Sequence, residues 1–166
     1  MNEIIDEPLT DSVEERYLSA YFGKRSAHYI DKFKDYKTRG KVSFNLGAFL
    51  LGLIWFFYRK LWLEGLVLAV IFIVLSIIEG FIYETYSVSE NTQQLVFYIS
   101  SGAVALFFGF VANYLYFKKT DKVVNRVKAE AIDEESRIYL LDKKGGISLI
   151  PFIIILLMII AILLLK

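Results

Sequence analysis

The fold is decided by LWLEGLVLAVIFIVLSIIEGFIY (residues 61–83) and by LVFYISSGAVALFFGFVANYLYF (residues 95–117). At about 1.5 Å of rise per helical residue, each run extends about 34 Å, enough to cross a hydrocarbon layer about 30 Å thick. The polar loop at 84–94 joins the two runs and contains no Lys or Arg. We therefore expect two transmembrane helices that form an antiparallel hairpin.

Two shorter apolar runs flank this hairpin, at 44–58 and at 149–165. As helices they extend about 22 Å and about 26 Å, so the first is too short to cross and the second crosses a thin bilayer. Apolar residues make up 56% of the chain, which is typical of an integral membrane protein. The chain has no Cys and a single His, which excludes a disulfide scaffold and argues against a zinc site.

The Lys and Arg residues indicate how the runs cross, because these residues stay on the cytoplasmic side. Four crossings divide the nineteen Lys and Arg residues almost equally between the two sides. If 44–58 enters the membrane and returns, every one of them except Lys166 lies inside. We therefore predict an all-α integral membrane protein with three transmembrane helices, one short re-entrant or interfacial helix at 44–58, and a cytoplasmic N-terminus. The alternative is four transmembrane helices.

This reading divides the chain into four parts. Residues 1–43 form a cytoplasmic amphipathic helical region, first acidic and then basic, and residues 44–117 form the membrane core. Residues 118–148 form a cytoplasmic helical loop, with one helix expected from Thr120 to about Asp142, and 149–165 is the C-terminal transmembrane helix. Between 16 and 43, basic residues surround an aromatic stripe, which favours a helix lying on anionic phospholipid head groups. The alternative is a helical hairpin whose aromatic side chains pack on each other. Nucleic-acid binding is not expected, because no recognition module accompanies the charge.

The membrane runs contain polar residues that are candidates for packing or function. Glu79 lies inside the second run, and a carboxylate at such a position is a functional hypothesis by default. Hydroxyl groups at Tyr98, Ser100 or Ser101 are its expected partners, with ion or proton handling as the alternative. In the third run, small or polar residues that suit close helix approach recur every four positions: Ser101, Ala105, Gly109 and Asn113. We expect this stripe to pack against small residues of the second run.

Sequence signatures of enzymes are absent. The chain has no Gly-x-Ser-x-Gly elbow, no His-Glu-x-x-His and no Walker A loop. We therefore expect a protein that is not an enzyme, with no catalytic residue, no cofactor and no metal.

Several short motifs resemble those of a bacterial family, domain-of-unknown-function family 2628. The most specific are Phe44-Asn45-Leu46-Gly47-Ala48-Phe49, Trp55 and Tyr58-Arg59-Lys60. Weaker ones are Tyr21-Phe22-Gly23-Lys24, Gly109 with Asn113 and Tyr116, and Gly145-Gly146-Ile147-Ser148. The resemblance implies a small protein of the bacterial inner membrane and no particular activity. It selects Asn45, Trp55, Tyr58, Arg59 and Lys60 for testing, with Asn45 capping the 44–58 segment and Arg59-Lys60 near lipid phosphates.

These observations together favour an interaction or accessory subunit of the cytoplasmic membrane. Its expected partners are the lipid bilayer and another protein or a second copy of the chain. One alternative is a small transporter or channel subunit that uses 44–58 and Glu79. Another is a membrane immunity protein that protects against a toxin.

Overall fold

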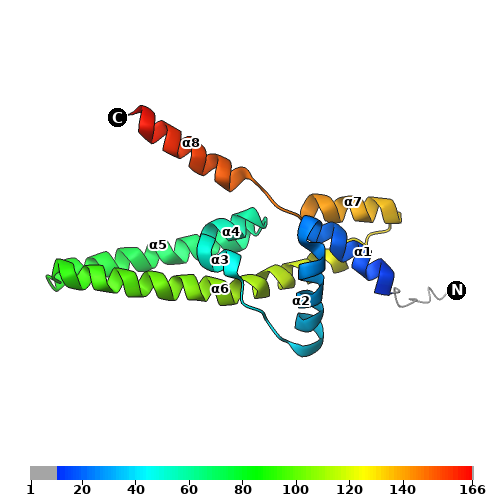
Figure 1. Cartoon of the computed structure of the whole chain (residues 1–166), viewed down its shortest axis with the longest axis horizontal. Coiled ribbons are helices and arrows are strands. Elements are labelled where there is room, and N and C mark those ends of the chain that lie inside the picture. Colours follow the sequence, from blue (N-terminus) through cyan, green and yellow to red (C-terminus); the bar gives the residue numbers. More distant parts are fainter. Residues whose placement is uncertain (1–10, 166) are drawn as a thin grey trace. The chain divides into compact units, whose positions relative to one another are not determined.

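The computed structural model describes residues 11–165, apart from the side chains of residues 11, 12 and 25. Within this range the chain forms eight α-helices and one 3-10 helix, and no strand (Figure 1). The predicted all-α class is therefore confirmed. The described residues fall into two compact units: 11–41 with 117–146 as unit 1, and 42–116 with 147–165 as unit 2.

The elements follow one another with short connections. They are α1 (Asp11–Phe22), η1 (Gly23–Arg25), α2 (Ser26–Arg39), α3 (Leu46–Leu51), α4 (Leu53–Tyr58), α5 (Trp62–Thr85), α6 (Glu90–Lys128), α7 (Glu134–Lys144) and α8 (Ile150–Leu164).

Unit 1 is a small helical unit with an aromatic core. Tyr17, Tyr21 and Phe22 of α1 are at most 2% exposed. Phe22 and Phe33 each meet the ring of Phe117 edge to face, at centroid distances of 6.4 and 5.7 Å. Such aromatic pairs add to the free energy gained by burying their large apolar surfaces.

This core corrects one prediction. The aromatic stripe of the N-terminal region does not lie open to a lipid surface, because Tyr29 and Phe33 are 6% and 4% exposed. The structure has the alternative, a helical hairpin whose aromatic side chains pack on each other and on the end of α6. The exposed faces of α1 and α2 are polar, with ion pairs such as that between Lys34 and Glu15.

A second correction concerns the helix expected from Thr120. Instead of beginning there, α6 continues through Thr120 to Lys128, and the Thr120 side chain is fully buried. The chain then breaks, and α7 begins after Asp133, whose carboxylate accepts the backbone N–H of Ser136 at 2.9 Å. A carboxylate at this N-cap position satisfies a free donor of the first helical turn.

The end of α7 lies directly against the backbone of α1. Gly146 N–H donates to the carbonyl oxygen of Tyr21 at 2.7 Å. A Cβ atom at Gly145 would lie 2.0 Å from the same oxygen, closer than any real contact. Only glycine fits at position 145, so the Gly145-Gly146 pair allows the end of α7 to pack directly on the backbone of α1.

In unit 2, the segment 44–58 forms two helices of six residues each, separated by Gly52. Gly52 has φ of 56° and ψ of −133°, a conformation that side-chain-bearing residues avoid. At about 1.5 Å per residue, each helix is about 9 Å long, so neither can cross a bilayer.

The end of α4 explains the Arg59-Lys60 pair. Lys60 N–H donates to the carbonyl of Phe57 and Leu61 N–H to that of Phe56, at 3.1 and 2.8 Å. This is the Schellman pattern, and Lys60 holds the left-handed position with φ of 57°. The two cations therefore lie where a helix C-terminus favours positive charge.

Helices α5 and α6 are long and apolar enough to cross a membrane, by length and composition. In their most apolar windows only 11% and 17% of residues are buried, which distinguishes them from the core helices of a soluble domain. They lie side by side in unit 2 (Figure 1), where Phe72 of α5 meets Phe108 of α6 at 5.2 Å between centroids. Helix α8 is apolar but shorter, with 15 residues.

Candidate functional site

Asn45 connects the start of α3 to α6 through three hydrogen bonds. Its carboxamide oxygen accepts the N–H of Ala48 at 2.9 Å, so it is the N-cap that the sequence predicts. Its Nδ2 donates to Oδ1 of Asn113 at 2.6 Å, and its backbone N–H donates to the carbonyl of Gly109 at 2.8 Å. The residue is 7% exposed, so these bonds replace water inside the protein.

Asn113 completes this network from α6. Its Nδ2 donates to the carbonyl and to the hydroxyl oxygen of Ser43, both at 2.9 Å. Asn113 is 1% exposed, and its amide group joins two parts of the chain that are 70 residues apart. The amide therefore fixes the segment before α3 onto α6.

Aromatic and cationic side chains lie beside this network. Trp55 is 3% exposed and meets Tyr116 edge to face, at 5.9 Å between ring centroids. The guanidinium carbon of Arg59 lies 5.0 Å from the centroid of the same ring, within the range of cation–π attraction. We call the set the junction cluster: Ser43, Asn45, Trp55, Arg59, Asn113 and Tyr116.

The junction cluster changes the expected role of Arg59. The side chain is only 4% exposed, so it lies inside the protein and not at lipid phosphates, as the sequence had suggested. Tyr58 is half-buried and contacts the C-terminal part of unit 2 instead of the junction cluster. Its carbonyl accepts the N–H of Ser148 at 2.8 Å, and its ring centroid lies 5.7 Å from that of Phe152 in α8. Lys60 is also half-buried, and its left-handed backbone conformation ends α4 as described above.

The small-residue stripe of α6 has a different neighbour from the one expected. At Gly109 a Cβ atom would lie 2.2 Å from the ring of Phe44, so an aromatic side chain and not a second helix covers this position. Ser101 and Ala105 line a groove in unit 2 instead of packing tightly on α5. On α5, a Cβ at Gly80 would meet nothing within 4 Å.

The groove contains Glu79 and has a volume of about 550 Å³. We call it the Glu79 groove. It is lined by fifteen described residues from α3, Gly52, the start of α4, α5 and α6: Phe49, Leu50, Leu51, Gly52, Leu53, Phe72, Leu75, Ser76, Glu79, Phe97, Ser100, Ser101, Val104, Ala105 and Phe108. Glu79 accepts a hydrogen bond from the hydroxyl group of Tyr83, one turn later on its own helix. This partner differs from the hydroxyl groups that the sequence suggested for Glu79. Ser100 and Ser101 line the same groove, but the Ser100 hydroxyl donates to the carbonyl of Phe97 at 3.2 Å.

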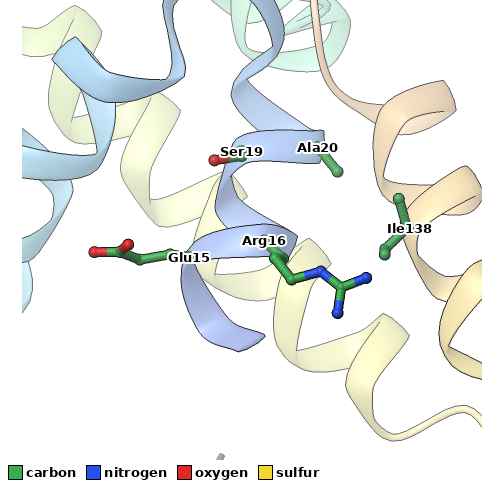
Figure 2. Close-up of a pocket in the computed structure, with 5 residues that line it drawn as sticks. All are labelled: Glu15, Arg16, Ser19, Ala20 and Ile138. Atoms are coloured by element: carbon green, nitrogen blue, oxygen red, sulfur yellow. The ribbon is translucent and has the colours of Figure 1, made fainter. Parts of the chain in front are cut away.

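Unit 1 has a surface hollow of about 520 Å³ between α1 and α7. Figure 2 shows Arg16 and Ala20 on the side of α1 toward Ile138 of α7, while Glu15 and Ser19 point away. Arg16 pairs with Glu134 at 2.7 Å, and both side chains are well exposed. The cation of this hollow is therefore paired within unit 1.

The described residues contain no group of three or more His, Asp or Glu side chains that suits a metal ion. Chemically, the two amides of the junction cluster form a hydrogen-bonded structural network with Ser43 and the start of α3, and the Glu79 groove is a mainly apolar site with one carboxylate. Sequence reasoning missed Tyr83 as the partner of Glu79, although its spacing of four residues is the one that brings helical side chains together. It also missed the contacts that Ser43 and Phe44 make with α6, because no pattern in the neighbouring sequence indicates them.

Comparison with known protein families gives a match over most of the chain. A family model described as protein of unknown function (DUF2628) matches residues 12–122, which is more than half of the chain. The match contains both the junction cluster and the Glu79 groove, and the Gly145-Gly146 motif lies beyond it. No curated protein matches the chain. No solved structure matches it either.

Proposed function

The chain belongs to the DUF2628 family, and from this premise we propose that it is an integral protein of the bacterial cytoplasmic membrane that acts as an interaction or accessory subunit and not as an enzyme. One observation carries the membrane part of this proposal. The apolar side chains of α5 and α6 point outward, with 11% and 17% of their apolar windows buried. Water disfavours such a surface, whereas hydrocarbon accepts it.

We further propose three crossings, by α5, α6 and α8, with the N-terminus and unit 1 in the cytoplasm. The break at Gly52 supports a segment that enters the membrane and returns, since two helices of about 9 Å reach only part of the way. Exposed cations after the apolar part of α6, such as Lys122 and Arg126, suit anionic phospholipid head groups.

Unit 1 is the proposed contact surface for a protein partner or for a second copy of the chain. Its aromatic core is closed, so its polar outer face is free for recognition without loss of the fold. The outer face of α7 includes Tyr139, which is 64% exposed, and tyrosine is enriched at protein interfaces.

Topology is tested by labelling single cysteines in intact cells, since the chain has no Cys of its own. A membrane-impermeant maleimide should modify Asn91→Cys near the start of α6 and leave Lys128→Cys unmodified until the cells are opened. Modification of Lys128→Cys in intact cells would refute the arrangement.

The accessory role is tested with a photocrosslinking amino acid at position 139. We expect one discrete adduct, identified by mass spectrometry as either a fixed partner or a dimer of this chain. The same amino acid in place of Leu163, on lipid-facing α8, is the control. A result with no adduct above this control would contradict the proposal.

A second function, a small transporter or channel subunit, is supported by the Glu79 groove. A carboxylate in a crossing helix is a feature of substrate and proton paths. Glu79→Gln separates the two functions: loss of flux in reconstituted vesicles by a folded variant favours transport, and unchanged cell phenotype with retained crosslinks favours the accessory role.

A further inference from the structure

We propose that the Glu79 groove binds a lipophilic organic cation, meaning a molecule with one positive centre on an apolar body. The inference rests on the proposed placement of α5 and α6 in a bilayer. It adds a ligand class that neither the family match nor the accessory role provides.

The size and the lining of the groove suit a small organic molecule. Its volume of about 550 Å³ lies within the range of ligand sites, about 300–1,000 Å³. Four phenylalanine rings, from three different parts of unit 2, contribute to its wall: Phe49, Phe72, Phe97 and Phe108. These surfaces would bury an apolar body and exclude water from it.

The charge of the groove indicates the sign of the ligand. Among its fifteen described lining residues, Glu79 alone is ionisable, and no Lys or Arg lines the groove. The carboxylate accepts a hydrogen bond from the Tyr83 hydroxyl, which holds one of its oxygens. A cationic ligand would supply the missing positive charge where hydrocarbon surrounds the site.

The chemistry of the lining favours an organic cation over a metal ion. Hard metal ions require about six or more oxygen ligands, whereas this groove offers one carboxylate and a few hydroxyl groups. Aromatic rings attract organic cations through their faces and also pack against the apolar groups around the charge. The combination of one carboxylate and four rings therefore selects a cation with a hydrophobic body.

Tetraphenylphosphonium is the probe for a direct test. The full chain in phosphatidylcholine nanodiscs is titrated with it, and binding is followed by calorimetry. We expect saturable binding that weakens about tenfold or more in Glu79→Gln and stays within about twofold of wild type in Glu84→Gln, the matched control on the exposed end of α5. Neutral triphenylphosphine oxide should bind wild type and Glu79→Gln alike, and more weakly than tetraphenylphosphonium binds wild type.

Three results would overturn the inference: no saturable binding to wild type, equal binding by Glu79→Gln, or equal binding of the neutral probe. If Glu79→Gln fails to fold, Ala105→Phe replaces it, because this change fills the groove from α6 and keeps the carboxylate. Loss of binding by folded Ala105→Phe supports the inference, and unchanged binding refutes it. The cysteine labelling described above is independent: expected labelling without binding refutes the ligand alone, whereas reversed labelling refutes the membrane arrangement.

Discussion

Replacing Asn113 by alanine tests whether the junction cluster holds unit 2 together. The substitution removes the acceptor at 2.6 Å from Asn45 Nδ2 and the donor shared by the two oxygens of Ser43. Asn45 is 7% exposed, so its amide would have little access to water. An unsatisfied buried polar group costs about 1–3 kcal/mol, and interhelical hydrogen bonds in membrane proteins contribute about 0.6–1.7 kcal/mol. Since the Asn45 amide is buried and Ser43 only half-buried, we expect a loss of about 2–4 kcal/mol in the free energy of unfolding.

The measurement is reversible unfolding in mixed micelles, followed by tryptophan fluorescence. Both Trp residues of the chain lie in unit 2, and Trp55 contacts Tyr116 in the junction cluster, so the signal reports on this region. Asn91→Ala, at an exposed position near the start of α6, is the matched control and should change stability by less than about 0.5 kcal/mol.

A double-mutant cycle with Asn45→Ala isolates the bond between the two amides. Residues in one hydrogen-bond network show coupling of about 0.5–3 kcal/mol, so the double variant should lose less than the two single variants together. An Asn113→Ala variant as stable as the control, or strictly additive effects, would refute the reasoning.

Two further predictions concern unit 1. Gly145→Ala should destabilise the unit by about 3 kcal/mol or more, because the new Cβ meets the backbone of Tyr21 at 2.0 Å; Gly40→Ala, with φ of 64° and nothing within 4 Å, should lose only about 1 kcal/mol. Thermal unfolding followed by circular dichroism compares them, and equal losses would contradict the clash. Hydrogen bonds from the hydroxyl and N–H of Ser136 hold the pKa of Asp133 below its ordinary value. This capping therefore stabilises α7 above the unfolded-state pKa of about 4 and is lost as pH falls through the lower folded-state pKa. The difference in helicity between wild type and Asp133→Asn, measured along an acid titration, should vanish only in that acidic range; a difference that disappears near neutral pH would contradict it.

The sequence predicts the two long apolar helices because their signal is local. Length and hydropathy identify α5 and most of α6. The 44–58 run was predicted as one short helix, whereas the structure has two, because Gly52 breaks the segment. Asn45 as a cap is likewise predictable, since a cap depends on residues within one turn. The end of α6 was misplaced because the cations Lys118 and Lys119 mark where apolar sequence stops and not where a helix stops.

Contacts between distant parts of the chain were not predictable from periodicity. A helical aromatic stripe shows which face is apolar, but the same stripe suits a lipid surface or a protein core. Phe117 decides between these two for α1 and α2, and it lies more than 80 residues away from Tyr36, which its ring meets at 5.6 Å. Gly109 is a similar case, since spacing indicates a close approach there but does not name Phe44 as the approaching group.

The two torsion angles of Gly52 have a mechanical consequence for the site beside them. Gly52 and its neighbours Leu51 and Leu53 line the Glu79 groove, so they form part of its wall. Two short rigid rods joined at one pivot can change their mutual angle without breaking any helical hydrogen bond within either rod. Because φ at Gly52 is 56°, we expect Gly52→Ala to strain this joint, to change the angle between α3 and α4, and so to alter the width of the groove that they line.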